Sequence, residues 1–145
     1  MEEKEFITHS ARETEDAGSR FANDLKAGDI VLLSGELGAG KTTFVQGVGR
    51  TLNVKSRIIS PTFVLLRKHK GKKGSKKINL YHIDLYRLEG SLDIRNLGLD
   101  DIFEDVSGIF LIEWGEKHEN LRATYEVAIE VLNNDERKIR IRTYE

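Results

Sequence analysis

Several common features are missing from this chain of 145 residues, which has no cysteine and only one proline. Without cysteine it forms neither disulfides nor thiolate metal sites, which is compatible with a reducing compartment. The N-terminus is acidic, and no apolar stretch approaches the roughly 18 residues of a membrane span. We therefore expect a cytoplasmic protein without membrane association.

Net charge is also almost absent, at −1, so nothing draws the whole chain towards nucleic acid or an anionic membrane. The charge is nevertheless segregated, because the segment from Arg67 to Lys77 holds seven Lys or Arg residues and no acid. The rest of the chain has 16 basic and 24 acidic residues, a net charge of −8. The basic segment could contact RNA or an acidic protein surface. It could equally be a solubilising loop, because no aromatic residue lies within it for base stacking.

One strong motif is present: residues 35–42 read GELGAGKT and match the phosphate-binding pattern G-x-x-x-x-G-K-[ST] at every fixed position. A short apolar run, residues 30–33, precedes the motif, and a helical pattern follows it. Strand, loop and helix are the order that the motif requires, so we predict a nest of backbone amides that binds phosphate. The predicted nucleotide-binding residues of this loop are Gly35, Glu36, Leu37, Gly38, Ala39, Gly40, Lys41 and Thr42.

Two residue types in and near the motif carry the predicted chemistry. Lys41 would reach the β- and γ-phosphates, while the Thr42 hydroxyl would ligate a Mg²⁺ that bridges them. Phosphoryl transfer also needs an acid at the end of a neighbouring strand, and Asp84 and Glu113 each follow an apolar run. Ligands of open α/β sheets lie beyond the carboxyl ends of the strands, so both acids are catalytic and metal-binding candidates. The spacing leaves open which acid holds the metal and which orients the attacking water.

Other polar and aromatic residues are weaker candidates. The hydroxyls of Ser60 and Thr62, beside the only proline, could sense the γ-phosphate or its magnesium, or belong to an ordinary turn. Trp114 could line the site, but a lone tryptophan more often fills the core. The histidines show no metal-ligand spacing and are interpreted as structural. They are His9, His69, His82 and His118.

Hydrophobic periodicity predicts an α/β layout in the first half of the chain. A capping box, residues 10–13, starts a helix that we expect Gly28 to end. Its predicted apolar side is Ala11, Thr14, Ala17, Phe21 and Leu25. A strand is expected before this helix, around residues 6–8, and a second helix after the phosphate loop. The predicted buried face of that second helix is Phe44, Val45, Val48 and Leu52.

The second half reads as hairpins around a buried strand. Runs at 63–66 and 78–85 predict a β-hairpin whose polar tip is residues 67–77. A short helix is expected from Ser91 to Gly98, followed by a single turn, and residues 109–112 read as a strand covered on both faces. Residues 125–141 predict a last hairpin. The fold class is therefore α/β, a P-loop NTPase-like central sheet flanked by helices with β-hairpin additions, forming a single domain over residues 1–145.

Several motifs in order, SGELGAGKTTFVQG, SPTF, YHIDLYRL, LGLDDIF and LIEWGEK, resemble those of the bacterial TsaE (YjeE) family of P-loop ATPases. The similarity covers about residues 30–117. It implies that the chain binds ATP and Mg²⁺ and works with TsaB and TsaD subunits in threonylcarbamoyladenosine modification of tRNA, without performing the transfer itself. It also implies that Thr42 and Glu113 hold magnesium and that Asp84 is the other acid needed for hydrolysis. Further motif positions fall on Thr43, Ser60 and Thr62, and the segment near Ser10 is expected to approach the adenine.

Three functions remain in view. The leading hypothesis is a slow, partner-stimulated ATPase whose nucleotide cycle drives or resets the TsaB–TsaD complex. The second is a small-molecule kinase, which would need an arginine-bearing lid, whereas the basic segment is mostly lysine. A guanine-specific GTPase is disfavoured, because the sequence contains no N-K-x-D string. The third is a non-catalytic, nucleotide-gated binding module that uses residues 67–77 to bind tRNA or protein.

Overall fold

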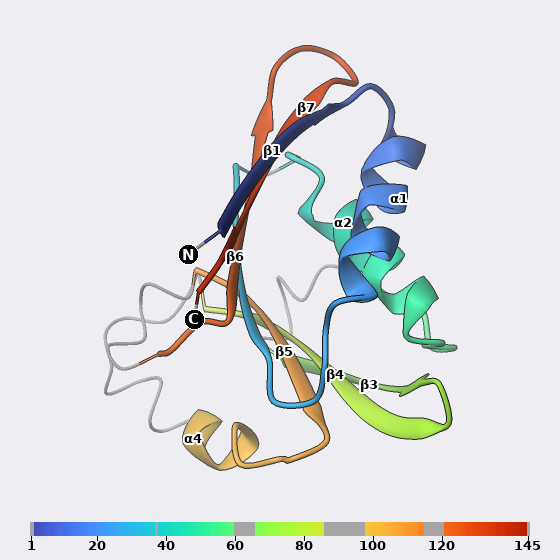
Figure 1. Cartoon of the computed structure of the whole chain (residues 1–145), viewed down its shortest axis with the longest axis vertical. Coiled ribbons are helices and arrows are strands. Elements are labelled where there is room, and N and C mark those ends of the chain that lie inside the picture. Colours follow the sequence, from blue (N-terminus) through green and yellow to red (C-terminus); the bar gives the residue numbers. More distant parts are fainter. Residues whose placement is uncertain (1, 37, 60–65, 86–97, 115–120, 145) are drawn as a thin grey trace.

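The computed structural model describes residues 2–36, 38–59, 66–85, 98–114 and 121–144. Within them the strands form one seven-stranded sheet in the order β1-β7-β6-β2-β5-β4-β3 (Figure 1). The strands are β1 (Glu2–Thr8), β2 (Ile30–Ser34), β3 (Leu66–Lys73), β4 (Lys76–Asp84), β5 (Gly108–Glu113), β6 (Tyr125–Val131) and β7 (Arg137–Thr143). The helices are α1 (Ala11–Ala22), α2 (Lys41–Thr51) and α4 (Leu99–Ile102).

The middle of the sheet is parallel and its two margins are antiparallel. β2 runs parallel to both β5 and β6, and β5 runs parallel to β4. Antiparallel pairing adds β7 and β1 at one margin and β3 at the other. The predicted α/β class with hairpin additions is confirmed. Because β2, β4 and β5 are parallel, their carboxyl ends meet at one edge of the sheet.

Helices α1 and α2 lie together on one face of the sheet (Figure 1). The predicted inner face of α2 is confirmed, since Phe44, Val45, Val48 and Leu52 are fully buried in the core between helices and sheet. None of the helices in the described ranges is long and apolar enough to cross a membrane.

The prediction for α1 was partly wrong. The Ser10 hydroxyl accepts a hydrogen bond from the Glu13 amide, as the capping box requires, but Ala11 in the first turn is exposed. The helix ends at Ala22, well before Gly28. The next amides, starting at Asn23, bond to carbonyls three residues back, so the chain tightens into turns and the α-helical pattern stops.

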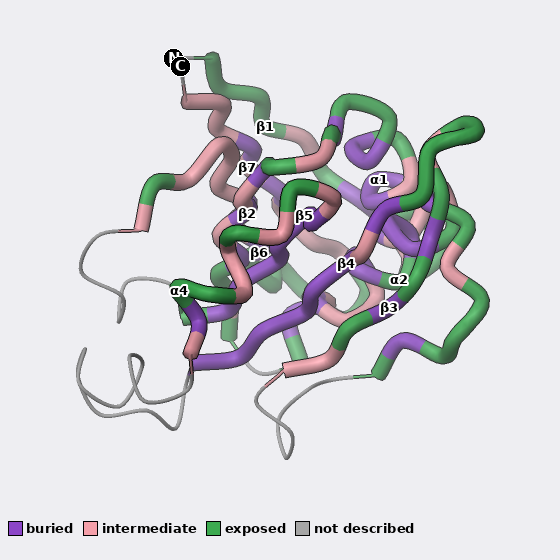
Figure 2. Tube along the Cα trace, turned by 90° about the horizontal axis from the view of Figure 1, so that it is seen from below, coloured by how far each residue is buried: buried purple, intermediate pink, exposed green. Residues whose placement is uncertain are grey.

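A second apolar layer covers the opposite face of the sheet. Tyr81 stacks on Phe110 with ring centroids 5.0 Å apart, and Phe103 meets the same ring edge-on at 5.1 Å. All six residues of β5 are buried, as predicted for a strand covered on both faces (Figure 2). In β4 the polar residues His82 and Asp84 alternate with apolar ones in the sequence, yet they are only 0% and 6% exposed. The alternation is present, but the polar side faces the helix layer.

The hairpin of β3 and β4 differs from the prediction. Strand β3 is Leu66–Lys73 and its turn lies at Gly74 and Ser75, so most of the segment predicted as a polar tip is strand. An edge strand tolerates charge because one of its sides faces solvent. The predicted strand residues 63–65 and the helix expected from Ser91 lie outside the described residues. The helical turn of α4 and the hairpin of β6 and β7 agree with the predictions.

The backbones of helices α1 and α2 are in direct contact at two glycines. A Cβ at Gly47 would overlap the carbonyl oxygen of Glu15, and one at Gly18 would overlap that of Phe44. Gly47→Ala is therefore expected to destabilise the fold by about 3 kcal/mol, lowering the Tm by roughly 10 °C. Thermal unfolding followed by circular dichroism measures this. The exposed α1 control Arg12→Ala should shift the Tm very little, and an unchanged Tm for Gly47→Ala would contradict this close packing.

Candidate nucleotide-binding site

The glycine-rich loop joins β2 to α2 at the carboxyl edge of the parallel strands. Gly35 has φ 147°, and a Cβ there would lie 2.6 Å from the carbonyl oxygen of Ile129, so only glycine fits without a shift. Gly40, the N-cap of α2, has φ 106° and is left-handed. These two glycines let the chain turn directly into the helix, so that the first amides of α2 point to the loop. The helix dipole then favours an anion at this point.

The loop lysine is buried beside an acid from another strand. Lys41 is 8% exposed, and its Nζ donates to the carbonyl oxygen of Gly35 at 2.7 Å. The same Nζ lies 3.1 Å from Oε1 of Glu113, at the end of β5. The fold thus brings the motif lysine and one predicted acid into direct contact.

Glu113 has a second partner that the sequence analysis did not identify. His82 is fully buried, and its Nε2 lies 2.8 Å from Oε2 of Glu113. Burial by itself would raise the pKa of the Glu113 carboxyl, but the hydrogen bond and charge of His82, together with the charge of Lys41, lower the pKa below its usual value. Glu113 is therefore held as a carboxylate between two nitrogen donors.

Asp84 lies beside this group on the neighbouring strand. It is the register partner of Glu113 in the parallel pair of β4 and β5 and is 6% exposed. His82 precedes it by two residues and so points to the same face of β4. The two predicted acids are brought together at one edge, next to the start of α2.

A cavity of about 310 Å³ opens at the start of the loop. It is lined by Leu33, Ser34, Gly35, Glu36, Lys41 and Trp114. Trp114 is 36% exposed and has φ 62°, which is uncommon for a residue other than glycine. The interpretation of Trp114 as core filling was wrong, because its side chain forms part of the wall next to Lys41.

A smaller cavity of about 110 Å³ lies against the later part of the loop and the start of α2. Its walls include Gly38, Gly40 and Thr43, together with Ala11 and Thr14 of α1. The N-terminal end of α1, just after Ser10, therefore borders the phosphate loop.

Arg137 fastens the loop to the turn between β6 and β7. Its Nε donates to the carbonyl oxygen of Ala39 at 2.9 Å, and its Nη1 donates to those of Asn133 and Asn134 at 3.2 and 3.1 Å. No sequence motif marks this residue, so the sequence did not predict it as part of the site. His82, by contrast, could have been found, since a period of two from Asp84 puts both side chains on one face.

The remaining candidates are placed as follows. Thr42 and Thr43 lie in the first turn of α2, half-buried, and Glu36 is exposed on the loop. Leu37, Ser60 and Thr62 lie outside the described residues. No cluster of three metal-ligating side chains occurs among the described residues. Mg²⁺ fits such a sparse set, because it is usually held by one or two carboxylates plus phosphate oxygens and water, and the hydroxyl and carboxylates here are the oxygen donors it prefers.

A strand, a glycine-rich loop that opens a helix, and acids at the ends of adjacent parallel strands define a P-loop nucleotide-binding protein. The family model described as "Threonylcarbamoyl adenosine biosynthesis protein TsaE" matches residues 8–141. The chain belongs to the TsaE family.

Individual relatives agree with this assignment. The Rickettsia prowazekii protein named tRNA threonylcarbamoyladenosine biosynthesis protein TsaE is 40% identical over 132 residues, 89% of this chain and 88% of that protein. The protein of the same name from Streptomyces coelicolor is 47% identical over 100 residues, 68% of this chain and 65% of that protein. The crystal structure of Bacillus subtilis YdiB superimposes with a TM-score of 0.77 at 27% identity, covering 99% of this chain and 87% of that one.

Proposed function

We propose that the chain binds ATP with Mg²⁺, hydrolyses it slowly, and uses this cycle to drive or reset a TsaB–TsaD complex during threonylcarbamoyladenosine modification of tRNA. One observation carries the catalytic part: Lys41 of the loop contacts Glu113 at 3.1 Å, with Asp84 as the strand neighbour of that acid. The names of the relatives support the pathway. A cytoplasmic location belongs to the same proposal.

Different groups of the site bind the phosphates, hold the metal and orient water. Loop amides and the start of α2 bind the phosphates, and Lys41 neutralises charge on their oxygens. Bound Mg²⁺ would supply electrostatic stabilisation of the triphosphate, held by the Thr42 hydroxyl and by Glu113 or Asp84. The acid that does not hold the metal orients water. Because His82 and Lys41 keep Glu113 ionised, this carboxylate is available to hold a metal or to orient water.

The loop's surroundings suggest which side takes which part of the nucleotide. The cavity beside Gly38, Gly40 and Thr43 adjoins the segment that follows Ser10, so we assign the nucleoside to that side. The cavity of Trp114 and Lys41 adjoins the acids, so we assign the γ-phosphate and the attacking water there. Ser60 and Thr62 remain proposed phosphate-sensing residues.

Phosphate release from ATP and Mg²⁺, measured with and without TsaB and TsaD subunits, tests the proposal. We expect slow release by the chain alone, at least about tenfold faster with the partners. No hydrolysis under either condition would overturn the ATPase and leave a nucleotide-gated binding module. Transfer of the γ-phosphate to an added small-molecule acceptor instead of water would favour a kinase, and preferential competition by GTP would exclude an ATP-specific site.

A further inference from the structure

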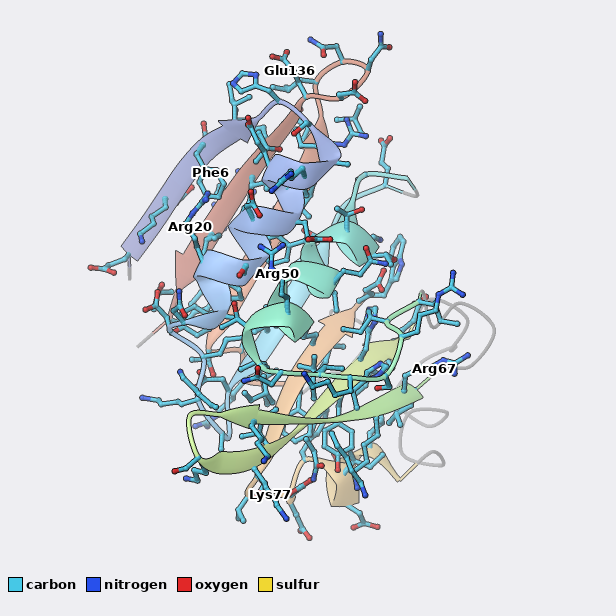
Figure 3. The ribbon with its side chains drawn as sticks, turned by 90° about the vertical axis from the view of Figure 1, so that its right-hand side faces the viewer. Phe6, Arg20, Arg50, Arg67, Lys77 and Glu136 are labelled. Atoms are coloured by element: carbon cyan, nitrogen blue, oxygen red, sulfur yellow. The ribbon has the colours of Figure 1, made fainter. Side chains whose placement is uncertain are left out.

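A groove of about 720 Å³ lies at the turn end of the β3–β4 hairpin. Four lysines line it: Lys70 and Lys72 from β3, Lys77 from β4, and Lys55 from the segment after α2. Asn53, Asn79 and Ser107 are its other polar lining residues. No carboxylate is among the described residues that line it. Figure 3 shows Lys77 near the turn of the hairpin and Arg67 at its other end.

The groove is built from hydrogen-bonded backbone. The Lys72 amide donates to the carbonyl oxygen of Leu52 at 2.6 Å, and Nδ2 of Asn53 donates to the carbonyl oxygen of Lys72 at 3.3 Å. Gly71 lets the two segments approach, because a Cβ there would overlap the Leu52 carbonyl oxygen. The segment carrying Lys55 is therefore fastened along the outer edge of β3. The lysines of three segments are held around one hollow.

Their charges are not neutralised within the described chain. Lys72 and Lys77 are register partners, and like charges directly opposite each other destabilise a sheet. In the described ranges, no carboxylate lies within ion-pair distance of Lys55, Lys70, Lys72 or Lys77. The groove thus keeps a repulsion that a bound polyanion would relieve.

Asp105, which contacts two residues of the groove lining, Asn79 and Ser107, is already engaged by protein donors. Oδ2 of Asp105 accepts hydrogen bonds from the Tyr81 hydroxyl at 2.7 Å and from Nδ2 of Asn79 at 2.9 Å. These bonds, with one from the Ser107 amide, hold the pKa of the Asp105 carboxyl below its usual value. Asp105 fixes Asn79 in the wall and does not compensate the lysines.

The lining favours one kind of polyanion. Lysine ammonium groups bind phosphate as point charges. Proteins bind single-stranded RNA by stacking its bases on aromatic rings, and they bind protein partners through aromatic or apolar side chains. The described lining of the groove has no aromatic side chain. Its one large apolar residue, Ile78, is 3% exposed. A row of phosphates, as on a double helix, fits these groups best.

We propose that this lysine groove binds the phosphate backbone of double-helical RNA without reading its sequence. The choice of RNA over DNA rests on the proposed function, because the names of the relatives concern a tRNA modification. Lys77 and Asp84 lie seven residues apart on β4, about 23 Å at the rise of a strand, so the groove is separate from the nucleotide site. The predicted tRNA contact of residues 67–77 is thereby narrowed to three of its lysines and extended to Lys55.

Binding of a fluorescein-labelled RNA duplex of about 20 base pairs, followed by anisotropy from about 50 to 200 mM KCl, tests this proposal. The groove variant replaces Lys55, Lys70, Lys72 and Lys77 by glutamine. The control variant replaces Lys4, Lys26, Lys76 and Lys138 by glutamine, which changes the net charge equally, and of these Lys76 lies on the same hairpin. Lys138 loses only an exposed ion pair with Glu5 at 3.3 Å.

We expect the groove variant to bind the duplex roughly 100-fold more weakly than the unmodified chain, with the salt slope reduced by about 1 per lysine. The control variant should stay within about threefold. Single Lys72→Gln and Lys77→Gln variants should each lower the slope by about 1, which serves if the fourfold variant does not fold. Equal losses in groove and control variants would overturn the proposal, since net charge alone would then explain binding.

Three further outcomes would contradict binding of double-helical RNA by the lysine groove. No duplex binding by the unmodified chain at low salt overturns the proposal, as does tighter binding of single-stranded RNA of the same length. Displacement of the duplex by polyglutamate at matched charge would instead indicate a surface for an acidic protein. The Lys41→Ala variant should bind the duplex as the unmodified chain does. Phosphate release therefore tests the ATPase proposal and duplex binding tests the groove proposal, so that either can fail without the other.

Discussion

Replacing Lys41 by alanine is expected to lower ATP turnover by at least about 100-fold, because the loop loses a buried cation that contacts the carbonyl oxygen of Gly35 and Glu113. Lysine charge in this motif stabilises the β- and γ-phosphate oxygens as negative charge shifts during transfer. Phosphate release under saturating ATP and Mg²⁺ gives the effect on turnover, and titration with a fluorescent ATP analogue gives the effect on binding.

The matched control for this experiment is Lys26→Ala, which removes an exposed lysine remote from the loop. It should leave turnover unchanged. Thermal unfolding of the Lys41→Ala variant checks the fold, since Glu113 keeps His82 as a partner at 2.8 Å. Turnover by a folded Lys41→Ala variant equal to that of the unmodified chain would exclude residues 35–42 as the hydrolytic site.

Glu113→Gln is expected to reduce turnover by roughly 100- to 1,000-fold while nucleotide binding changes much less. Glutamine keeps the size of the side chain but removes the charge that holds a metal or accepts a proton. Turnover and binding are measured as for Lys41, over a range of Mg²⁺ concentrations. If Glu113 holds the metal, more Mg²⁺ recovers part of the turnover. If added Mg²⁺ instead recovers turnover in Asp84→Asn, then Asp84 holds the metal and Glu113 orients water. Unchanged turnover in both variants would show that neither acid takes part in hydrolysis.

The same substitution has a consequence for stability that does not depend on activity. The lowered pKa of Glu113 means that its ionised form stabilises the folded state. That contribution is fully present above about pH 4.5 and is lost as the pH falls through the lowered folded-state pKa. Urea unfolding between about pH 3 and 7 should therefore show a smaller acid-side loss of stability in Glu113→Gln than in the unmodified chain.

His82→Gln is the comparison variant for this measurement. It puts an uncharged amide in place of the imidazole, so the charge of His82 that helps to lower the pKa of Glu113 is lost, this pKa rises and the acid-side loss begins at higher pH. A purely structural role for His82 would lower stability equally at every pH. An unchanged pH profile in both variants would contradict the electrostatic account of this group.

The local features of the fold could be read from the residues themselves. A glycine-rich loop needs backbone angles such as those of Gly35 and Gly40 whatever surrounds it, and the inner face of α2 follows from a period of 3.6 residues. The continuous apolar run before Glu113 likewise predicted a strand buried on both sides. The loop conformation, the inner face of α2 and the burial of β5 all follow from residues that are near one another in the sequence.

Alternation in β4 shows where such local reasoning ends. A period of two puts Asp84 and His82 on one face of the strand, but whether that face meets water or the helix layer depends on the whole sheet. The hairpin of β3 and β4 shows the same limit, because lysine-rich residues were interpreted as a loop although pairing with β4 makes them strand. Propensity is weak against the register that the rest of the sheet imposes.

By itself the sequence determined that a phosphate loop would open a helix and that acids would end two strands. Only the tertiary structure decided that Glu113 meets Lys41 and His82, and that Arg137 bonds to the carbonyl oxygen of Ala39, 98 residues earlier in the chain. The physical reason is that backbone conformation is set by adjacent residues, whereas these contacts depend on the order and register of strands. Long-range packing selects that order, and no spacing along the chain encodes it.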